Sequence, residues 1–526
     1  MNYADLFRVT LPETALEVAA LLVLIIDLAF LRKVALQLRV SIAALLGVAG
    51  CGAALYAMQF QGNIGLSFGN TGESFLLATG GYTAVAQIGI LVLTALTLLL
   101  LIDTNFTRHV GEYVAVVLMS ATGGLLIAGA QDLLVIFIGL ELLSLGLYII
   151  TAFAKSSAKS AESAIKYYLF GGMSAAFLLF GFSYFYGLAG TTNLAEIQHV
   201  IVDQGTSPLF YLAWVLVVAG LGFKVAAVPF HLWAPDTYEG APASAAAFIA
   251  SVSKVASFAL LITIGLKWSF PDEPIIAKAG VVAKYMLGFS QCWQMLAPVL
   301  LILAAASMIL GNLAALAQVS VRRLLAYSAV AHAGYILLGI AAHPNYPPEF
   351  VGFGPLGDSL AATFLSTNAV LYYILTYGLT TIGAFGVVAV VERATGSDRI
   401  DSFLGLHKRN PLLAAVLLVL FLSLAGIPPL VGFWAKFNLF AAVLGVSAGP
   451  VPFALVALAI AMSAVSLYYY LQVLKRAYVM PAVDETPIVT PQVTMAVLLL
   501  IAAAVVVMGI FPSLLQGWIQ SFYPVL

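Results

Sequence analysis

The sequence carries little charge. Of its 526 residues, 9% are Asp, Glu, Lys or Arg and 62% are hydrophobic, and the mean hydropathy is +1.05. Because a water-soluble domain carries about 25% charged residues, this composition excludes a water-soluble globular enzyme. The net charge of −1 provides no basic surface for nucleic acid and no polybasic segment for anionic membrane surfaces. We therefore expect lipid to surround most of the chain.

Cysteine is almost absent. The two cysteines, Cys51 and Cys292, lie far apart in the sequence, so no Cys-x-x-Cys pair, iron–sulfur cluster or thiolate zinc site is expected. The six histidines are scattered without the spacing of metal ligands, and no Walker loop for nucleotide phosphates is present. The chain is therefore not expected to hold a cofactor or metal, and its energy must come from a partner or from another ion.

Long apolar runs dominate the sequence. A membrane-spanning helix needs about 20 mostly apolar residues, and we expect an all-α polytopic membrane protein with about fourteen such helices. The first run has no basic segment before it, which favours a retained helix over a signal peptide. The expected spans are 12–31, 40–58, 82–102, 112–130, 133–153, 163–187, 208–230, 241–266, 293–313, 324–342, 369–391, 411–445, 450–473 and 492–517.

Lysine and arginine distinguish the two sides of the membrane. One set of alternate loops holds fourteen of these residues and the other holds four, three of them in the longer loop 267–292. Cytoplasmic loops retain positive charge during insertion, so we expect both termini on the periplasmic side of a bacterial inner membrane. The fourteen are Arg32, Lys33, Arg39, Arg108, Lys155, Lys159, Arg322, Arg323, Arg393, Arg399, Lys408, Arg409, Lys475 and Arg476.

The four remaining basic residues, all lysines, fall inside apolar runs. They are Lys166, Lys224, Lys254 and Lys436, and Glu141 also lies inside a run. Inserting a lysine at the bilayer centre costs a free energy of roughly 2.5–3.5 kcal/mol, which suggests that these lysines have a function. A buried lysine can lose and regain its proton whereas arginine stays charged, and a nearby carboxylate favours the charged lysine. The pattern predicts a proton relay through these lysines, modulated by the glutamate.

Other interpretations of these polar residues stay open. Lys166 lies near the start of its run, where its side chain can reach the interface. His332 lies in the middle of a run, where it either extends a proton path or forms a hydrogen bond between helices. The lysines as a group can also act as a scaffold that ties helices together through ion pairs.

Prolines interrupt two of the lysine-bearing runs. Pro229 follows Lys224, and Pro428 and Pro429 precede Lys436. A proline removes a backbone donor, which hydrocarbon tolerates only where the break faces protein or water. We therefore expect broken helices 7 and 12, each with a hydrated cavity.

The two breaks are five helices apart, which indicates two five-helix repeats. Since five is odd, the second copy must be inverted in the membrane, and we assign helices 4–8 and 9–13 to the repeats. The expected units are a three-helix segment 1–111, a first repeat 112–267, an outer-face loop 268–292, a second repeat 293–477 and a C-terminal helix 478–526.

Seven segments of the sequence carry recognisable motifs: Leu11 to Glu13, Gly139 to Leu142, Ala164 to Tyr168, Gly222 to Lys224, Pro229 to Pro242, Arg323 to Ser328 and Gly426 to Lys436. They resemble the antiporter-like membrane subunits of respiratory complex I, most closely the N type of bacterial proton-translocating NADH:quinone oxidoreductase, the counterpart of mitochondrial subunit 2. In the related L and M types and in Mrp antiporters, the segment after helix 7 looks more like Trp-Leu-Pro-x-Ala-His, from which Trp233 to Tyr238 departs.

The resemblance implies a role for each intramembrane residue. Glu141 matches the modulating glutamate, Lys224 the lysine of the first half-channel, Lys254 the central relay lysine and Lys436 the lysine near the exit. The secondary matches are Lys166 and His332.

The resemblance also implies partners. These are other complex I membrane subunits of the A, H, J, K, L and M types and a peripheral redox arm that carries FMN, iron–sulfur clusters and quinone. This chain's share is then proton transfer, in an enzyme whose redox chemistry takes place elsewhere. The alternative is a subunit of a Mrp-type cation/proton antiporter.

Overall fold

The computed structural model describes residues 3–522 except 62–65, 68–74, 105, 206, 268–278, 343–354, 447–448 and 483. Almost all regular structure is helical. The elements are α1 Tyr3–Val9, α2 Leu11–Ala29, α3 Leu36–Ala57, η1 Met58–Phe60, β1 Leu66–Ser67, β2 Phe75–Leu77, α4 Gly81–Leu101, α5 Val110–Gly129, α6 Leu133–Thr151, α7 Ala158–Ala189, α8 Leu194–Gln204, α9 Pro208–Val225, α10 Trp233–Gly240, α11 Ala243–Lys267, α12 Ala279–Leu316, α13 Val321–Ala341, α14 Pro355–Thr395, η4 Ile400–Phe403, α15 Leu406–Arg409, α16 Pro411–Ala425, α17 Val431–Val446, α18 Pro450–Tyr478, α19 Gln492–Ile510 and α20 Pro512–Gln520.

The expected helical membrane fold is confirmed, with one short pair of strands in addition. Among the described residues, twelve helices are long and apolar enough to cross a membrane, and each coincides with one of the expected spans. The expected span 411–445 is formed by two shorter apolar helices, α16 and α17. The expected first span is the 19-residue helix α2, which carries three acidic residues.

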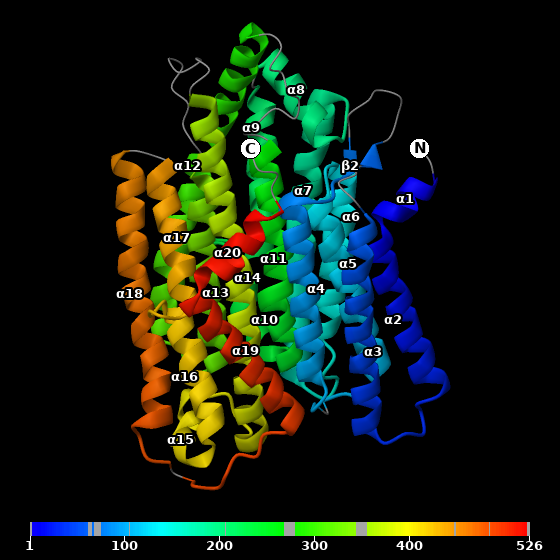
Figure 1. The fold of residues 1–526 in the computed structure, drawn as a ribbon, viewed down its shortest axis with the longest axis vertical. Helices are drawn as coiled ribbons and strands as arrows, with labels where there is room; N and C mark the ends of the chain where they lie inside the picture. Colours follow the sequence, from blue (N-terminus) through cyan, green and yellow to red (C-terminus); the bar gives the residue numbers. More distant parts are fainter. Residues whose placement is uncertain are drawn as a thin grey trace.

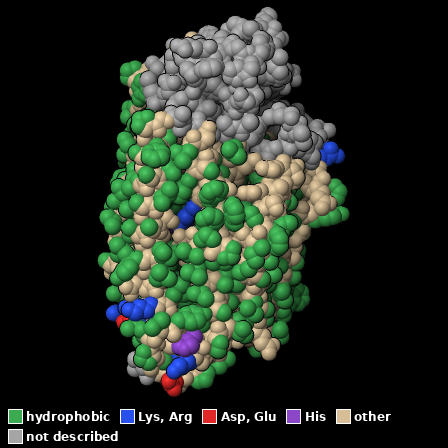
Figure 2. Space-filling model, turned by 60° about the vertical axis from the view of Figure 1, so that its left-hand side comes forward, with side chains coloured by type: hydrophobic (Ala, Val, Ile, Leu, Met, Phe, Trp, Pro, Cys, Tyr) green, Lys and Arg blue, Asp and Glu red, His purple; other side chains and the backbone are tan. Residues whose placement is uncertain are grey.

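The helices run side by side along the long axis of the molecule (Figure 1). The N-terminal helices α2 and α3 lie at one side, α16 to α18 lie at the opposite side, and α11, α13 and α14 lie between them. The membrane-spanning parts of α11, α13 and α14 are almost completely buried, whereas α18 is mostly exposed. Figure 2 shows that hydrophobic side chains cover most of the face over the outer helices, while most of the charged side chains in view gather at the lower end.

Several connections meet at one end of the bundle. The Gln37 side chain donates to the carbonyl oxygen of Ile102 at 2.8 Å, and the amide of Thr494 donates to the Asp103 carboxylate at 3.0 Å. The starts of α3 and α19 therefore lie beside the end of α4. We call this the basic end, because the connections and helix ends on this side carry the fourteen basic residues named above.

The two expected helix breaks are present and share one backbone pattern. Helix α9 ends at Val225 and the next residue, Ala226, has a left-handed conformation with φ 57°; helix α16 ends at Ala425 and Gly426 follows with φ 86°. The peptide bonds that precede Pro229 and Pro429 are both cis. The second halves of the broken helices are α10 and α17.

Three features differ from the expected elements. The last expected span, 492–517, is divided: α19 ends at Ile510, and Pro512, which cannot continue the hydrogen-bond ladder but suits a first turn, begins α20. Helix α12 begins at Ala279, inside the segment expected as a loop, of which residues 268–278 lie outside the described residues. The amphipathic helix α8 and the β1–β2 hairpin lie in segments between apolar runs.

Candidate functional site

Lys224 lies near the end of α9 with its side chain buried. Its Nζ donates to Ser144 Oγ at 2.5 Å, and Ser144 Oγ donates to the Leu140 carbonyl at 2.5 Å. Glu141 is three residues before Ser144 on α6 and half-buried, and its charge acts on Lys224. Within the described part of the chain no ion pair closer than 4 Å joins the two, so the carboxylate acts on the lysine through space.

Lys254 lies in the middle of α11, 3% exposed. Its Nζ donates to the carbonyl oxygen of Val225, the last residue of α9. The last carbonyls of a helix have no partner inside that helix and form the negative end of its dipole. The break in the seventh span therefore supplies the oxygen that holds this ammonium group.

Lys436 lies on α17 and is 6% exposed. Its Nζ donates to the carbonyl oxygens of Leu424 at 3.1 Å and Ala425 at 3.0 Å, and to Ser463 Oγ at 2.8 Å. The same nitrogen lies 5.5 Å from the centre of the Tyr335 ring. Ala425 is the last residue of α16, as Val225 is of α9. The two lysines thus bind equivalent carbonyls at the two breaks.

Helix α13 places polar groups beside Lys436. His332 Nδ1 is 2.8 Å from the Tyr373 hydroxyl, and its ring centre is 4.6 Å from that of Tyr377. Three residues further along α13, the Tyr335 hydroxyl accepts from Asn312 at 3.1 Å. The charge of Lys436 acts on His332. The histidine therefore joins the cluster near Lys436 and also forms a hydrogen bond between α13 and α14.

Several buried hydroxyl groups in the bundle require a further hydrogen-bond partner. In the described part of the chain the side-chain oxygens of Tyr238, Ser257 and Tyr372 have no hydrogen-bond partner. Buried polar groups in native proteins are almost always paired with protein or with water. We expect water beside these three groups, because buried polar groups without a protein partner are commonly paired with ordered water.

Lys166 occupies a different environment from the other three lysines. Its Nζ lies 2.8 Å from both the Asp236 and the Glu162 carboxylates, and its side chain is 41% exposed. The structure therefore brings Lys166 into an ion-pair network at the basic end.

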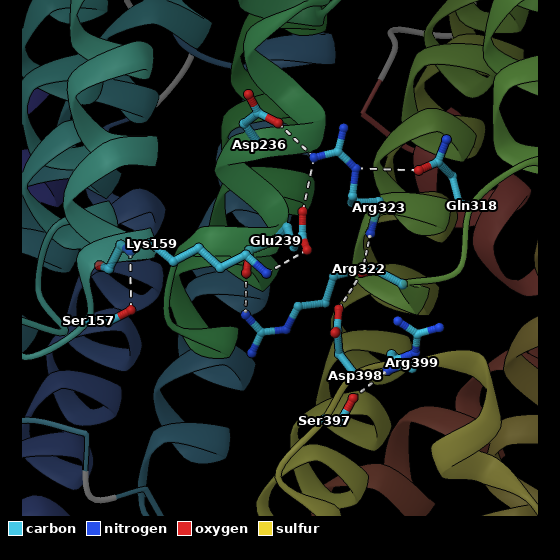
Figure 3. Close-up of polar contacts among 12 residues, drawn as sticks. Ser157, Lys159, Asp236, Glu239, Gln318, Arg322, Arg323, Ser397, Asp398 and Arg399 are labelled. Atoms are coloured by element: carbon cyan, nitrogen blue, oxygen red, sulfur yellow. Dashed lines mark hydrogen bonds and ion pairs between the residues drawn. The ribbon is translucent and has the colours of Figure 1, made fainter.

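This network joins α7, α10 and α13 (Figure 3). Arg323 Nη1 lies 2.7 Å from Asp236 and 2.9 Å from Glu239, and Lys159 Nζ lies 2.5 Å from Glu239. Helix α10, the second half of the broken span, is thereby held to helices on both sides of it.

Arg322 extends the network to α14. It pairs with Glu392 and donates to the carbonyl oxygens of Glu239 at 3.2 Å and Ala241 at 2.7 Å. The sequence shows Asp236 and Glu239 on one face of α10, but their arginine partners lie more than eighty residues away. The spacing of residues within the segment of α10 therefore could not predict this ion-pair network.

The network predicts a dependence of stability on pH. Burial alone would raise the pKa of Asp236 and Glu239, but ion pairs with Lys166, Arg323 and Lys159 outweigh it and hold each pKa below its ordinary value of 3.8 or 4.5. Groups with lowered pKa stabilise the fold above their unfolded pKa and lose this effect as the pH falls through the folded pKa. We expect Arg323→Gln to lower the melting temperature above about pH 4.5, and the difference from wild type to shrink below it.

Thermal unfolding of the detergent-solubilised protein, followed by tryptophan fluorescence at several pH values, tests this. Lys408→Gln is the matched control, because Lys408 is an exposed cation of the basic end. A difference for Arg323→Gln that stays constant down to about pH 3 would contradict the assignment.

Comparison with known proteins places this arrangement in a family. A family model described as "NADH:quinone oxidoreductase/Mrp antiporter, TM" matches residues 130–276 and 274–463. NADH-quinone oxidoreductase subunit N 2 of Acidobacterium capsulatum is 45% identical over 533 residues, which cover 99% of each chain. Subunit N of Desulfovibrio desulfuricans is 36% identical over 537 residues, or 97% of this chain and 96% of the relative.

Solved structures agree with the sequence relatives. A chain of respiratory complex I from Thermus thermophilus with bound aureothin superposes with a TM-score of 0.73 at 30% identity, over 96% of this chain and 98% of that chain. A chain of the Mrp complex from Dietzia sp. superposes with a TM-score of 0.75 at 20% identity, over 97% of this chain and 96% of that one, which shows a common fold. Among the described residues no cluster of three His, Cys, Asp or Glu could hold a metal ion. The protein belongs to the family of transmembrane subunits shared by NADH:quinone oxidoreductases and Mrp antiporters.

Proposed function

We propose that the chain is a proton-translocating membrane subunit of NADH:quinone oxidoreductase, in which quinone reduction elsewhere in the complex drives proton transfer through buried lysines. One observation carries the proposal: Lys254 and Lys436 are buried in the bundle and each binds a carbonyl at the end of a broken helix. The 45% identity to a subunit N over 99% of both chains supports the same function.

The geometry suggests how a proton is held and released. A helix-end carbonyl favours the ammonium form of a lysine through a charge-assisted hydrogen bond. A small movement of the helix end away from the nitrogen removes that bond, and burial then favours the neutral amine. We assign the central relay to Lys254 and the exit-side step to Lys436, because each nitrogen contacts such a carbonyl.

Glu141 and Lys224 form the input pair of the proposed relay. The charge of Glu141 acts on Lys224 without a direct ion pair, so a change in the surroundings of Glu141 alters how strongly Lys224 holds its proton. His332 is a secondary member because it contacts Tyr373 of α14 from α13 and lies beside the charge of Lys436. Lys166 has the least support as a member of the relay, since ion pairs with two carboxylates hold it at the basic end.

The assembly follows from the same proposal. FMN, iron–sulfur clusters and quinone belong to partner subunits, and the membrane partners are of the A, H, J, K, L and M types. The basic end faces the cytoplasm of a bacterium, with both termini periplasmic. The units 112–267 and 293–477 are inverted repeats, for which the common backbone pattern at Ala226 and Gly426 is the support.

Affinity capture tests this function. A tag on this chain is used to extract the native complex in mild detergent, and the captured material is assayed for NADH-dependent quinone reduction and analysed by mass spectrometry. We expect the activity together with flavin and iron–sulfur subunits. Capture with other membrane subunits alone, and sodium- or potassium-driven proton flux in proteoliposomes, would instead establish a Mrp-type antiporter, which the family model also includes.

A further inference from the structure

A hollow of about 310 Å³ lies between α4, α14, α19 and α20. Figure 1 shows α19 and α20 meeting at an angle, with α4 beside them. Val92 of α4 and Leu500 of α19 line the hollow and are 41% and 61% exposed, so it opens onto the surface of the helix bundle. Its lining on α4 runs from Ile88 to Leu96, the middle of that helix. The hollow therefore lies deep in the membrane, at the level of the lipid hydrocarbon.

The lining of the hollow is apolar. No charged side chain is among its described lining residues, and Thr376 carries the only hydroxyl group. That hydroxyl donates within its own helix, to the carbonyl oxygen of Tyr372 at 2.7 Å. The hollow therefore offers no group that requires water. An apolar cavity of about 150 Å³ stays dry and takes up benzene, so a hollow of about twice that volume suits a longer hydrocarbon.

Helix α20 separates this hollow from a polar cavity. Leu515 and Trp518 line the hollow, whereas Gln516 and Gln520 line a different cavity of about 210 Å³ between α14, α17 and α20. Ile519, which is 1% exposed, lies between these two faces of the helix. The order of polar and apolar residues along α20 thus keeps its glutamines out of the hollow.

The end of α19 joins the hollow to the second helix break. Met508 lines the hollow, and at the next residue, Gly509, a Cβ atom would lie 2.2 Å from the backbone oxygen of Pro429. The Gly509 carbonyl also accepts from Trp434 Nε1 of α17 at 2.8 Å. Whatever fills the hollow therefore supports the helix end against which the second break rests.

We propose that one acyl chain of a membrane phospholipid occupies this hollow and holds the bend between α19 and α20 against the second break. Bilayer hydrocarbon is the apolar partner available at this depth. A polypeptide segment fits less well, because its backbone N–H and C=O groups would find no partner in the lining. Because four helices surround the bound chain, it exchanges more slowly than the lipid at the outer faces of the bundle.

A photoreactive lipid tests the site. Phosphatidylcholine with a diazirine in the middle of one acyl chain is incorporated into membranes that contain the native complex. The complex is extracted in mild detergent and irradiated before or after exchange with excess unlabelled phosphatidylcholine, and mass spectrometry locates the adducts on this chain. We expect Val92 and Met508 to keep most of their adducts after the exchange. Val507, which is exposed on α19 outside the lining, should lose its adducts severalfold.

A matched pair of variants makes the result specific. Ala504 is half-buried and lines the hollow, so the ring of Ala504→Phe takes the place of the acyl chain. We expect this variant to lose the persistent adducts at Val92 severalfold. Ala503→Phe adds the same ring to the neighbouring residue, which is exposed outside the lining, and should leave them unchanged. Native gels normalise each result to the amount of assembled complex.

A second filling variant guards against failure of the first to assemble. Val92→Phe fills the hollow from α4, with the adducts at Met508 as its measure, and loss in either variant supports the site. Adducts in the wild type that exchange as fast as those at Val507 would overturn the proposal, as would persistent adducts in both filling variants. A wild-type hollow that takes up no label would also overturn it, in favour of a neighbouring subunit as the cover. None of these measurements involves proton transfer, so the site and the proposed function stand or fall separately.

Discussion

We expect replacement of Lys254 by methionine to abolish most proton translocation while the complex still assembles, and replacement by arginine to have the same effect. Methionine fills a similar volume but carries no proton, and arginine keeps its charge permanently. General acid–base groups contribute factors of about 100 or more, so we expect NADH-driven acidification of inside-out vesicles to fall about tenfold or more in both variants. Fluorescence quenching of a permeant amine dye measures it.

The arginine variant separates a relay from a scaffold. If Lys254 only tied α11 to the end of α9, arginine would donate to the Val225 carbonyl as well and would retain activity. Lys408→Met is the matched control, because Lys408 is exposed at the basic end and should tolerate the change. The amount of assembled complex, measured on native gels, normalises each rate. Full acidification by Lys254→Arg would contradict the relay.

Gly432→Ala is expected to disrupt the site of Lys436. A Cβ atom at residue 432 would lie 1.8 Å from the backbone oxygen of Ser423, so α16 and α17 must separate. Overpacking of this kind typically costs about 1–3 kcal/mol or more. Because Lys436 binds the carbonyls of Leu424 and Ala425 at the end of α16, the separation weakens those bonds. We expect reduced assembly and, per assembled complex, a severalfold loss of acidification.

The control for this variant lies on the same helix. Gly445→Ala adds an identical methyl group to α17 at a place where nothing lies within 4 Å, so assembly and acidification should remain at wild-type levels. If Gly432→Ala behaves like Gly445→Ala, the close approach of the two half-helices does not determine the position of Lys436.

The fold could be predicted from the sequence because the thickness of the lipid bilayer sets the length of the apolar run that each spanning helix needs. The expected spans coincide with helices, and Pro229 and Pro429 fall at breaks, because proline cannot supply the missing backbone donor. The division of the last span at Pro512 was missed because the apolar run continues through it. Hydrophobicity alone does not register where a helix changes direction.

The candidate site was predictable only in part. The unusual cost of lysine in a membrane identified Lys224, Lys254 and Lys436, but not what each nitrogen binds. The partners of Lys254 and Lys436 include main-chain oxygens. Every residue has such an oxygen, so the sequence does not indicate which ones bind a lysine. The ion pairs of Arg323 with α10 were equally hidden, since they depend on which helices meet in space.

The two breaks hold their lysines in mechanically different ways. Lys436 and the carbonyls it binds flank one and the same interruption, so the angle between α16 and α17 sets that contact. Lys254 instead reaches the end of α9 from the separate helix α11, so the spacing between two helices sets its contact. A tilt of one half-helix at the second break therefore acts on the contact of Lys436, whereas a sideways displacement of α9 acts on the contact of Lys254 and also moves Lys224, which α9 itself carries. We therefore expect Lys254 and Lys436 to gain and lose their protons at different moments of one cycle, because a bend between two half-helices sets one contact and the spacing of two separate helices sets the other.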